Sequence, residues 1–403
     1  MIITPKTRGF ICTTAHPIGC AKNVENQIHA VKAKGAYKGP KHVLVIGAST
    51  GYGLASRIAA TFGAGAKTIG VFFEKPSEGG RTASPGWYNT AAFETLAHQE
   101  GYYAKSINGD AFSKEIKKQT MALIKQDLGS VDLVIYSLAS PRRVHPDTGE
   151  VFSSCLKPIH QPFIGKSVDP LRREIKDVHL DPATEEDVLN TVQVMGGEDW
   201  AMWMDALASE DLLAEGVISM AYDYIGPELT HAIYKNGTIG KAKDHLYKTA
   251  MELNKTLEKY HGQAFLSVNK ALVTQASAAI PVVPLYISIL YKIMKEAGTQ
   301  EGCIEQLARL LKDKIYSGKP IELDPAGRIR MDDYEMESGV QQKIKALWPK
   351  VTTENLATLT DIDGYCKEFY QLFGFEVPGI DYGMDVSVDV KIPSLSLRQF
   401  PRE

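Results

Sequence analysis

The stretch HVLVIGASTGYGLASRIAATFG, residues 42–63, decides the fold of this 403-residue chain. Its VLVI run is apolar without interruption and has the length of a strand at the centre of a parallel sheet. Gly47, Gly51 and Gly53 follow as G-x-x-x-G-x-G, and the small residues Ala55 and Ala59 mark a helix that can approach the sheet closely. Such a loop lets backbone N–H groups and a helix N-terminus face a pyrophosphate. The stretch predicts a dinucleotide-binding unit; a tight turn without a ligand is the alternative.

Strands and helices continue to alternate after this unit. Strands are predicted at 67–75, within 101–112 and at 131–140, with helices between them. After an insertion at about 141–200, GVISMAYDY and residues 263–274 supply a fifth and a sixth strand, and an apolar helix is predicted over 278–297. This alternation implies right-handed crossovers. The predicted fold class is α/β, a Rossmann-type doubly wound parallel sheet.

Acidic residues end two of these strands. Glu74 ends the second strand, where a carboxylate can accept hydrogen bonds from the adenosine ribose and would repel a 2′-phosphate. This position favours NAD over NADP, although Glu74 could also be a solvated strand end, because Lys75 and Arg81 are close. Asp110, after the third strand, is a candidate acceptor for the adenine amino group. The small residues after the fourth strand would lie beside the nicotinamide ribose.

A second chemical signal lies in AYDYIGPELTHAIYKNGTIGKAK, residues 221–243. It carries tyrosines and lysines across a predicted strand-to-helix junction. Free tyrosine has a pKa of about 10, and a neighbouring ammonium is expected to lower it by favouring the phenolate. A reductase needs such a pair to stabilise negative charge on oxygen. An ordinary surface helix with Tyr and Lys is the alternative.

Composition narrows the function classes. The net charge of −3 indicates no field for nucleic acid or an anionic membrane. The apolar stretch from Ala278 to Tyr291 is too short to span a bilayer, and the N-terminus lacks the apolar run of a secretory signal. Five scattered cysteines favour a reducing cytoplasm. We expect no metal site, because Pro17 and Gly19 interrupt the helical spacing of Cys12, His16 and Cys20.

Together these motifs resemble the FabV-type enoyl reductases, which are the NADH-dependent enoyl-ACP reductases and the related trans-2-enoyl-CoA reductases. The resemblance covers essentially the whole chain. Tyr234 and Lys243 have the Y-x8-K spacing of that family, longer than in ordinary short-chain dehydrogenases or other enoyl reductases. The other matching phrases are GASTGYG (47–53), MGGEDW (195–200), YDYIG (222–226), SVNKALVTQASAAIP (267–281) and RMDDYEM (330–336).

The resemblance implies a monomeric enzyme with one body over residues 1–403. Its Rossmann core would cover 42–300, larger than an ordinary short-chain dehydrogenase, and a C-terminal extension over 301–403 would pack on it. The substrate would be an enoyl thioester carried by CoA or acyl carrier protein. Tyr234 would be the proton donor, Tyr224 would contact the substrate, and Lys243 would bind the nicotinamide ribose. The residues implied to line NAD are Gly47, Ala48, Ser49, Thr50, Gly51, Tyr52, Phe73, Glu74, Asp110, Ala111, Leu138, Ala139, Leu272, Val273 and Thr274.

Two other functions fit parts of the pattern. One is a short-chain dehydrogenase that acts on a carbonyl, which suits the Tyr/Lys pair but not its spacing. The other is a Rossmann protein that senses NAD without chemistry, against which the presence of both Tyr234 and Lys243 argues.

Overall fold

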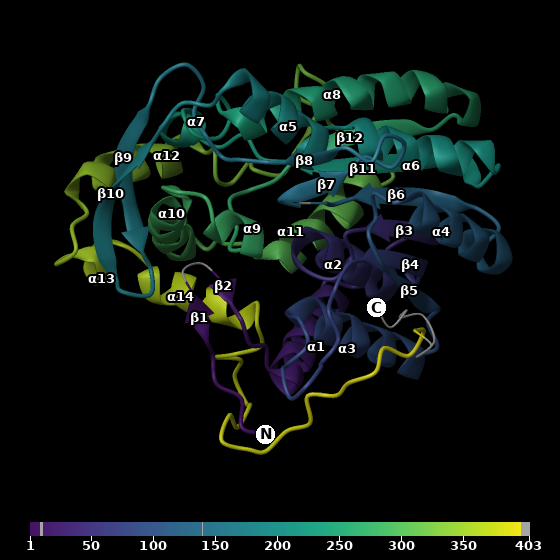
Figure 1. The fold of residues 1–403 in the computed structure, drawn as a ribbon, viewed down its shortest axis with the longest axis horizontal. Helices are drawn as coiled ribbons and strands as arrows, with labels where there is room; N and C mark the ends of the chain where they lie inside the picture. The colour runs from purple at the N-terminus through teal and green to yellow at the C-terminus, as the bar shows by residue number, and fades with distance from the viewer. Residues whose placement is uncertain (9–10, 139, 396–403) are drawn as a thin grey trace.

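The computed structural model describes residues 1–8, 11–138 and 140–395. Its centre is a seven-stranded sheet in the order β13-β12-β11-β6-β3-β4-β5, in which every neighbouring pair is parallel (Figure 1). The strands are β3 (His42–Ile46), β4 (Lys67–Phe72), β5 (Ala104–Asn108), β6 (Val131–Tyr136), β11 (Leu213–Asp223), β12 (Gln263–Val268) and β13 (Ile329–Arg330). The predicted doubly wound parallel sheet is therefore confirmed. The edge strand β13 adds a seventh member to the six predicted strands.

The strand order reverses at β3. Val43 lies opposite Thr68 of β4 on one side and opposite Leu133 of β6 on the other. The chain thus winds outward from β3 in one direction through β4 and β5, and then returns to start the other half at β6. In such sheets the reversal point leaves a crevice at the carboxyl ends of the strands, where ligands bind.

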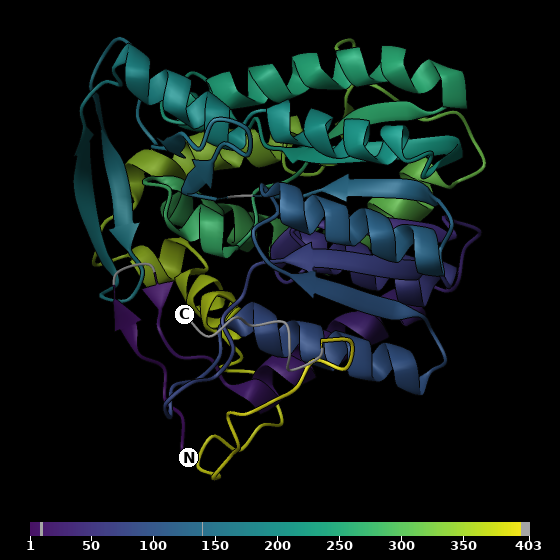
Figure 2. The same cartoon turned by 45° about the vertical axis from the view of Figure 1, so that its right-hand side comes forward.

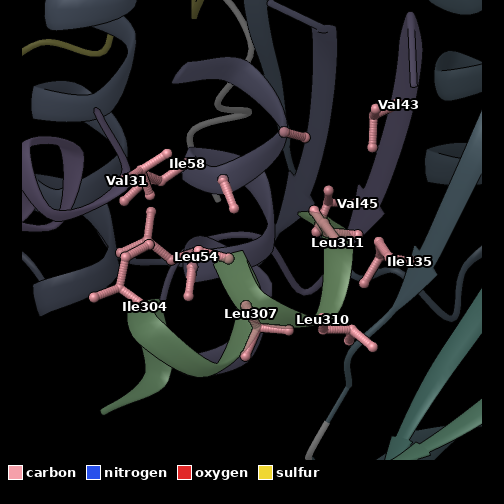
Figure 3. Close-up of a cluster of buried hydrophobic side chains, with 14 of the residues drawn as sticks. Val31, Val43, Val45, Leu54, Ile58, Ile135, Ile304, Leu307, Leu310 and Leu311 are labelled. Carbon is pink, nitrogen blue, oxygen red and sulfur yellow. The ribbon is translucent and has the colours of Figure 1, made fainter. Parts of the chain in front are cut away.

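One face of the sheet is covered by helices from both ends of the sequence. Figure 3 shows Val45 of β3 and Ile135 of β6 facing Leu54, Leu310 and Leu311, all of them buried. The covering elements are α1 (Pro17–Ala33), α2 (Gly51–Ile58), the π-helical turn η1 (Ala59–Gly63), α3 (Pro85–Gln99), α11 (Cys303–Arg309) and the π-helical turn η3 (Leu310–Ile315). The C-terminal part of the chain therefore completes the core around the glycine-loop helix.

Helices of the middle of the chain cover the other face. These are α4 (Lys114–Asp127), α6 (Glu198–Ser209) and α8 (Thr238–Leu257), which ends in the 3-10 turn η2 (Glu258–Tyr260). Trp200 and Trp203 of α6 are fully buried against this face. The sheet is buried on both sides, as its continuous apolar strands predicted.

A second apolar body stands over the carboxyl ends of the strands (Figure 2). It contains β9 (Phe163–Asp169), β10 (Glu174–Leu180), α9 (Gln275–Ala278), α10 (Val283–Ala297), α12 (Ser338–Leu347), the 3-10 turn η4 (Trp348–Lys350), α13 (Leu356–Leu359) and α14 (Ile362–Gln371). The helix predicted over 278–297 is present as α10, but its start is wrong: the chain breaks between α9 and α10, where Val282 has a φ of +74°. Pro281 lacks an N–H and disfavours helix at Ile280, which explains the break, whereas Pro284 lies in the first turn of α10, where no N–H is needed.

The insertion is more regular than its polar sequence indicates. Residues 141–200 contain β7 (Arg142–Val144), β8 (Val151–Ser153), the β9–β10 hairpin and α5 (Glu185–Met195). Helix α5 starts with a capping box, in which Thr184 and Asp187 bond each other's backbone N–H. The short elements β1 (Thr7–Arg8), β2 (Ile11–Cys12) and α7 (Glu228–His231) complete the described chain. In its described parts no helix is long and apolar enough to cross a membrane.

Residues 377–395 form a C-terminal strap that runs back across α1 and α3 (Figure 1, yellow). Trp87 Nε1 donates to the Val390 carbonyl at 2.7 Å, and Tyr88 Oη donates to the Val388 carbonyl at 2.8 Å. Ser394 Oγ donates to Glu94 at 2.7 Å, and the N-terminal amine of the chain reaches the Val386 carbonyl at 2.6 Å. The N-terminus and the C-terminal strap are thereby connected to each other, and the strap is fixed to α3.

Candidate active site

A cavity of about 870 Å³ lies at the carboxyl ends of the strands, at the reversal point between β3 and β6. It brings together most of the predicted site residues, although they come from positions 47 to 274 of the sequence. Its walls include Gly47, Ser49, Thr50, Gly51, Tyr52, Phe73, Glu74, Asp110, Ala111, Leu138, Tyr224, Tyr234, Lys243, Leu272, Val273 and Thr274. Ala48 is fully buried beneath the loop, and Ala139 lies outside the described residues.

The glycine loop has the shape of a phosphate cradle. Gly47 has a φ of +88°, and a Cβ there would lie 2.0 Å from the Ser137 carbonyl oxygen, so only glycine fits. Gly51 has a φ of +53°, and the atom nearest to a Cβ on it is Thr274 Cγ2 at 3.9 Å, so its Cα faces open space. Thr50 makes no side-chain capping bond to α2. The loop and the helix N-terminus can therefore receive a pyrophosphate without a side chain in the way.

Glu74 is held in place at the end of the strand after the loop. Ser49 Oγ donates to Glu74 Oε1 at 2.7 Å, and Asn108 bonds both the N–H and the carbonyl of Glu74, at 2.8 and 2.9 Å. Burial raises the pKa of Glu74, while hydrogen bonds from Ser84 and Ser49 lower it. Phe73 beside it is 76% exposed at the rim of the cavity. Glu74 is therefore half-buried and held by Ser49 and Asn108, unlike a side chain free in solvent.

The two tyrosines meet inside the cavity. The rings of Tyr224 and Tyr234 pack edge to face with centroids 5.0 Å apart, and both residues line the cavity. Gly226, with a φ of +67°, turns the chain between them. This fold-back places a residue of the β11 end against a residue just before α8. The surface-helix interpretation of this stretch is excluded, since Tyr234 is buried.

Lys243 lies on the same wall but is not bonded to the tyrosine. Its Nζ donates to the Tyr222 carbonyl at 2.7 Å. Burial raises the pKa of Tyr234, and the negative charge of Asp223 raises it further. The expected lowering of the tyrosine pKa by a neighbouring ammonium is therefore wrong, because desolvation of the phenolate dominates. Burial lowers the pKa of Lys243, and the same Asp223 opposes that shift.

Charged residues that were not predicted also line the cavity, namely Asp223, Lys270, Glu305 and Glu368, and Glu335 lies behind Tyr224. Lys270 is fully buried, donates to the Ala271 carbonyl at 3.0 Å and lies 4.9 Å from the Tyr291 ring centre. Burial lowers the pKa of Lys270 to about 8. Glu335 is also fully buried and bonds Tyr224 Oη at 3.1 Å. A lysine at the apolar end of a strand is a signal that sequence reasoning could have used; Glu335, in the acidic run MDDYEME, offers none.

Two family models match most of this chain. The model of the trans-2-enoyl-CoA reductase catalytic region matches residues 81–316, and that of the NAD(P)H binding domain of trans-2-enoyl-CoA reductase matches residues 2–79. The chain belongs to the trans-2-enoyl-CoA reductase family. The predicted family is therefore confirmed.

Proteins with similar sequences match this chain over nearly its whole length. An enoyl-[acyl-carrier-protein] reductase [NADH] of Flavobacterium johnsoniae is 62% identical, over 98% of this chain and 100% of that protein. A trans-2-enoyl-CoA reductase [NADH] of Ruminiclostridium cellulolyticum is 56% identical over the same shares. The crystal structure of Treponema denticola trans-2-enoyl-CoA reductase in complex with NAD superposes with a TM-score of 0.93, at 51% identity, over 96% of this chain and 98% of that one.

A third family model, named the enoyl reductase FAD binding domain, matches residues 323–386. The residues of this segment do not fit a flavin. Only Glu368, Gln371 and Leu372 of it line the cavity, all on α14 or at its end. Its one strand, β13, has two residues and leads into no glycine-loop helix, and its helices α12 and α14 pack apolar side chains against α10. In this member of the family the end of α14 lines the cavity, and the helices of the segment pack behind it against α10.

Proposed function

We propose that Tyr234, Lys243 and Tyr224 form the reaction centre of an NADH-dependent reduction of trans-2-enoyl thioesters. The chain is an oxidoreductase of that type, and NADH, when bound, supplies the hydride for the β-carbon. The observation that supports the assignment is the edge-to-face pair of Tyr224 and Tyr234, which shares one cavity with the glycine loop and Lys243.

The protonation states suit an acid rather than a base. As the β-carbon is reduced, negative charge develops on the thioester oxygen, and a hydroxyl aimed at that oxygen stabilises the charge. Because the pKa of Tyr234 is raised, its hydroxyl is protonated at neutral pH and is a donor. Protonation of the α-carbon completes the reduction. Lys243, with one N–H on the Tyr222 carbonyl, has further N–H groups for the nicotinamide ribose hydroxyls.

The remaining predicted residues have roles set by their places in the cavity. The loop 47–52 would receive the pyrophosphate, with Ala48 supporting it from below. Glu74 would accept hydrogen bonds from the adenosine ribose and exclude a 2′-phosphate, which gives NADH preference. The adenine would lie near Phe73, Asp110 and Ala111. The nicotinamide would lie near Leu138 and 272–274.

The acyl chain needs an apolar slot beside the tyrosines. Ile280, in the break before α10, and Val283, the first residue of α10, line the cavity. The helix beyond them is buried among α12 and α14. We therefore assign the first turn of α10 to the acyl slot and the rest of it to the core.

The oligomeric state, compartment and substrate carrier of the enzyme are part of the same proposal. We propose one enzyme body of residues 1–403, acting as a monomer in the cytoplasm on thioesters of CoA or acyl carrier protein, without a nucleic acid or membrane partner. The five cysteines are free thiols, as in a reducing compartment. Relatives are named for both carriers, so both are substrates to test.

The experiment follows the loss of NADH absorbance in a single turnover with crotonyl-CoA and with crotonyl-ACP. Tyr234→Phe should lower the rate by about 10²–10⁴, as for loss of a positioned acid, and keep NADH affinity. Tyr224→Phe should also lower kcat. Tyr247→Phe is the matched control, since this tyrosine of α8 donates to the Ala326 carbonyl outside the cavity. Acetoacetyl-CoA tests the carbonyl reductase alternative. Normal chemistry in Tyr234→Phe would transfer the donor role elsewhere.

A further inference from the structure

Glu335 connects three elements that face the cavity. This residue lies in the loop between β13 and α12, and its side chain is fully buried. Its Oε1 accepts from Tyr224 Oη at 3.1 Å and from Tyr286 Oη of α10 at 2.7 Å. Its Oε2 accepts from the Ala271 N–H at 2.7 Å. One carboxylate thus connects the end of β11, the helix α10, and the loop that leads to residues 272–274.

The direction of each hydrogen bond can be assigned. Gln341 Nε2 donates to Tyr286 Oη at 3.1 Å, so the Tyr286 proton is free to point at Glu335. The backbone N–H of Ala271 can only donate. Burial raises the pKa of Glu335, while the bonds from Tyr286 and the Ala271 N–H and the charge of Lys270 oppose that shift. In its carboxylate form Glu335 accepts from all three partners, and a tyrosine hydroxyl has a single proton. The Tyr224 proton is therefore committed to Glu335 and not to the cavity.

We propose that Glu335 is a positioning residue of the reaction: it fixes the Tyr224 hydroxyl relative to the loop at 271–274. The Tyr234 proton is then the one available to the thioester oxygen. This inference rests on the proposed function, because it takes Tyr234 as the donor to the reacting oxygen and Tyr224 as the ring packed against it. It also gives the segment 323–386 a role at the site that needs no flavin.

Replacing Glu335 by glutamine keeps the shape of the side chain but puts a hydrogen-bond donor where one acceptor oxygen was. Its amide oxygen still accepts from the Ala271 N–H. Its NH₂ group then faces Tyr224 and Tyr286, whose protons lose their acceptor. The Tyr224 hydroxyl must rotate, and its ring is no longer held against Tyr234. Where residue 224 is phenylalanine there is no hydroxyl to displace, so the same substitution should have little further effect.

The test is a double-mutant cycle of Glu335→Gln and Tyr224→Phe, read as steady-state kcat, as the single-turnover rate constant and as KM for NADH. We expect Glu335→Gln to lower kcat about tenfold or more, as for a hydrogen bond to a charged group. In the Tyr224→Phe background the same substitution should lower kcat less than about twofold. A change of that size lies within the scatter of about 0.3–0.5 kcal/mol seen between independent sites. KM for NADH should stay near the wild-type value in all four proteins.

Equal losses in both backgrounds would overturn the inference and leave the proposed function standing. A Tyr224→Phe enzyme with wild-type kcat would overturn both this inference and the role proposed for Tyr224. If Glu335→Gln does not fold, Tyr286→Phe replaces it in the cycle, because it removes the other donor to the same oxygen. Asp332→Asn is the control for damage to the segment: its buried carboxylate bonds Arg330 at 2.6 Å, and the substitution should lower Tm without a Tyr224-dependent change in kcat.

Discussion

Replacing Gly86 by alanine tests the role of Glu74 without changing that residue. A Cβ at position 86 would lie 2.0 Å from Glu74 Oε1 and 2.7 Å from Ser49 Cβ. Ser49 Cβ is attached to the glycine loop, whereas the carboxylate is the far end of a flexible side chain. We therefore expect Gly86→Ala to fold, with the carboxylate displaced from Ser49 Oγ and from the place of the adenosine ribose.

The size of the effect follows from the hydrogen bond to the ribose that the displaced carboxylate could no longer accept. A hydrogen bond to a charged group contributes about 1.5–3 kcal/mol, so kcat/KM for NADH should fall by about 10- to 100-fold. The repulsion between two unit charges is about 4 kcal/mol at about 4 Å with an effective dielectric constant of about 20, and about 2.4 kcal/mol at about 7 Å. Moving the carboxylate by that amount removes about 1.8 kcal/mol of repulsion and should raise kcat/KM for NADPH about twentyfold.

The assay compares kcat/KM for NADH and NADPH at saturating enoyl thioester. Glu74→Ala serves as the reference for complete loss of the carboxylate. Gly339→Ala on α12 is the control, since a Cβ there meets no atom within 4 Å. A folded Gly86→Ala enzyme with wild-type kcat/KM for both cofactors would refute the assignment of Glu74 as the residue that selects NADH.

Three further substitutions test other parts of the site. Gly51→Val should abolish NADH binding in a folded protein, because the side chain enters the pyrophosphate space; unchanged affinity by calorimetric titration would contradict the loop assignment. Val283→Phe should lower kcat/KM for dodecenoyl more than for crotonyl thioesters, at about 0.8 kcal/mol per excluded methylene, with KM for NADH unchanged. Equal effects would return the start of α10 to the core. Lys270→Met should remove a pH dependence of stability: burial lowers the Lys270 pKa to about 8 from 10.5, so the unfolded state binds more protons between these values and wild-type stability rises with pH there. Thermal melts over this range should show a flatter profile for the variant, and parallel profiles would exclude the shift.

The cofactor half of the site was predictable because its signals are local. Residues 42–63 contain strand, loop and helix in one stretch, and the loop between β3 and α2 lies at the cavity as predicted. Glu74 and Asp110 each come two residues after the end of their strand. In a parallel sheet the carboxyl ends of strands meet at one edge, so topology alone brings these residues together.

The support of the site was not predictable, since it depends on contacts between distant segments. Glu335 is 111 residues from Tyr224, and its acidic neighbours resemble a solvated run. The two-residue strand β13 is too short for any periodicity. The direction of the Tyr234 pKa shift was also missed, because it depends on how much protein surrounds the ring, which a Tyr–Lys spacing does not reveal.

The C-terminal strap has a consequence for synthesis on the ribosome. Trp87 bonds the carbonyl of a residue 303 positions later, and Tyr88 one 300 positions later. At about 5–20 residues per second, α3 emerges about 15–60 s before its cover exists. During that time its apolar side, with Trp87, Tyr88 and Ala91, lies open to other molecules. The nascent chain should therefore stay bound to a chaperone until the last residues leave the exit tunnel, and a nonsense codon near position 377 should yield an aggregating product, although every strand has already been made.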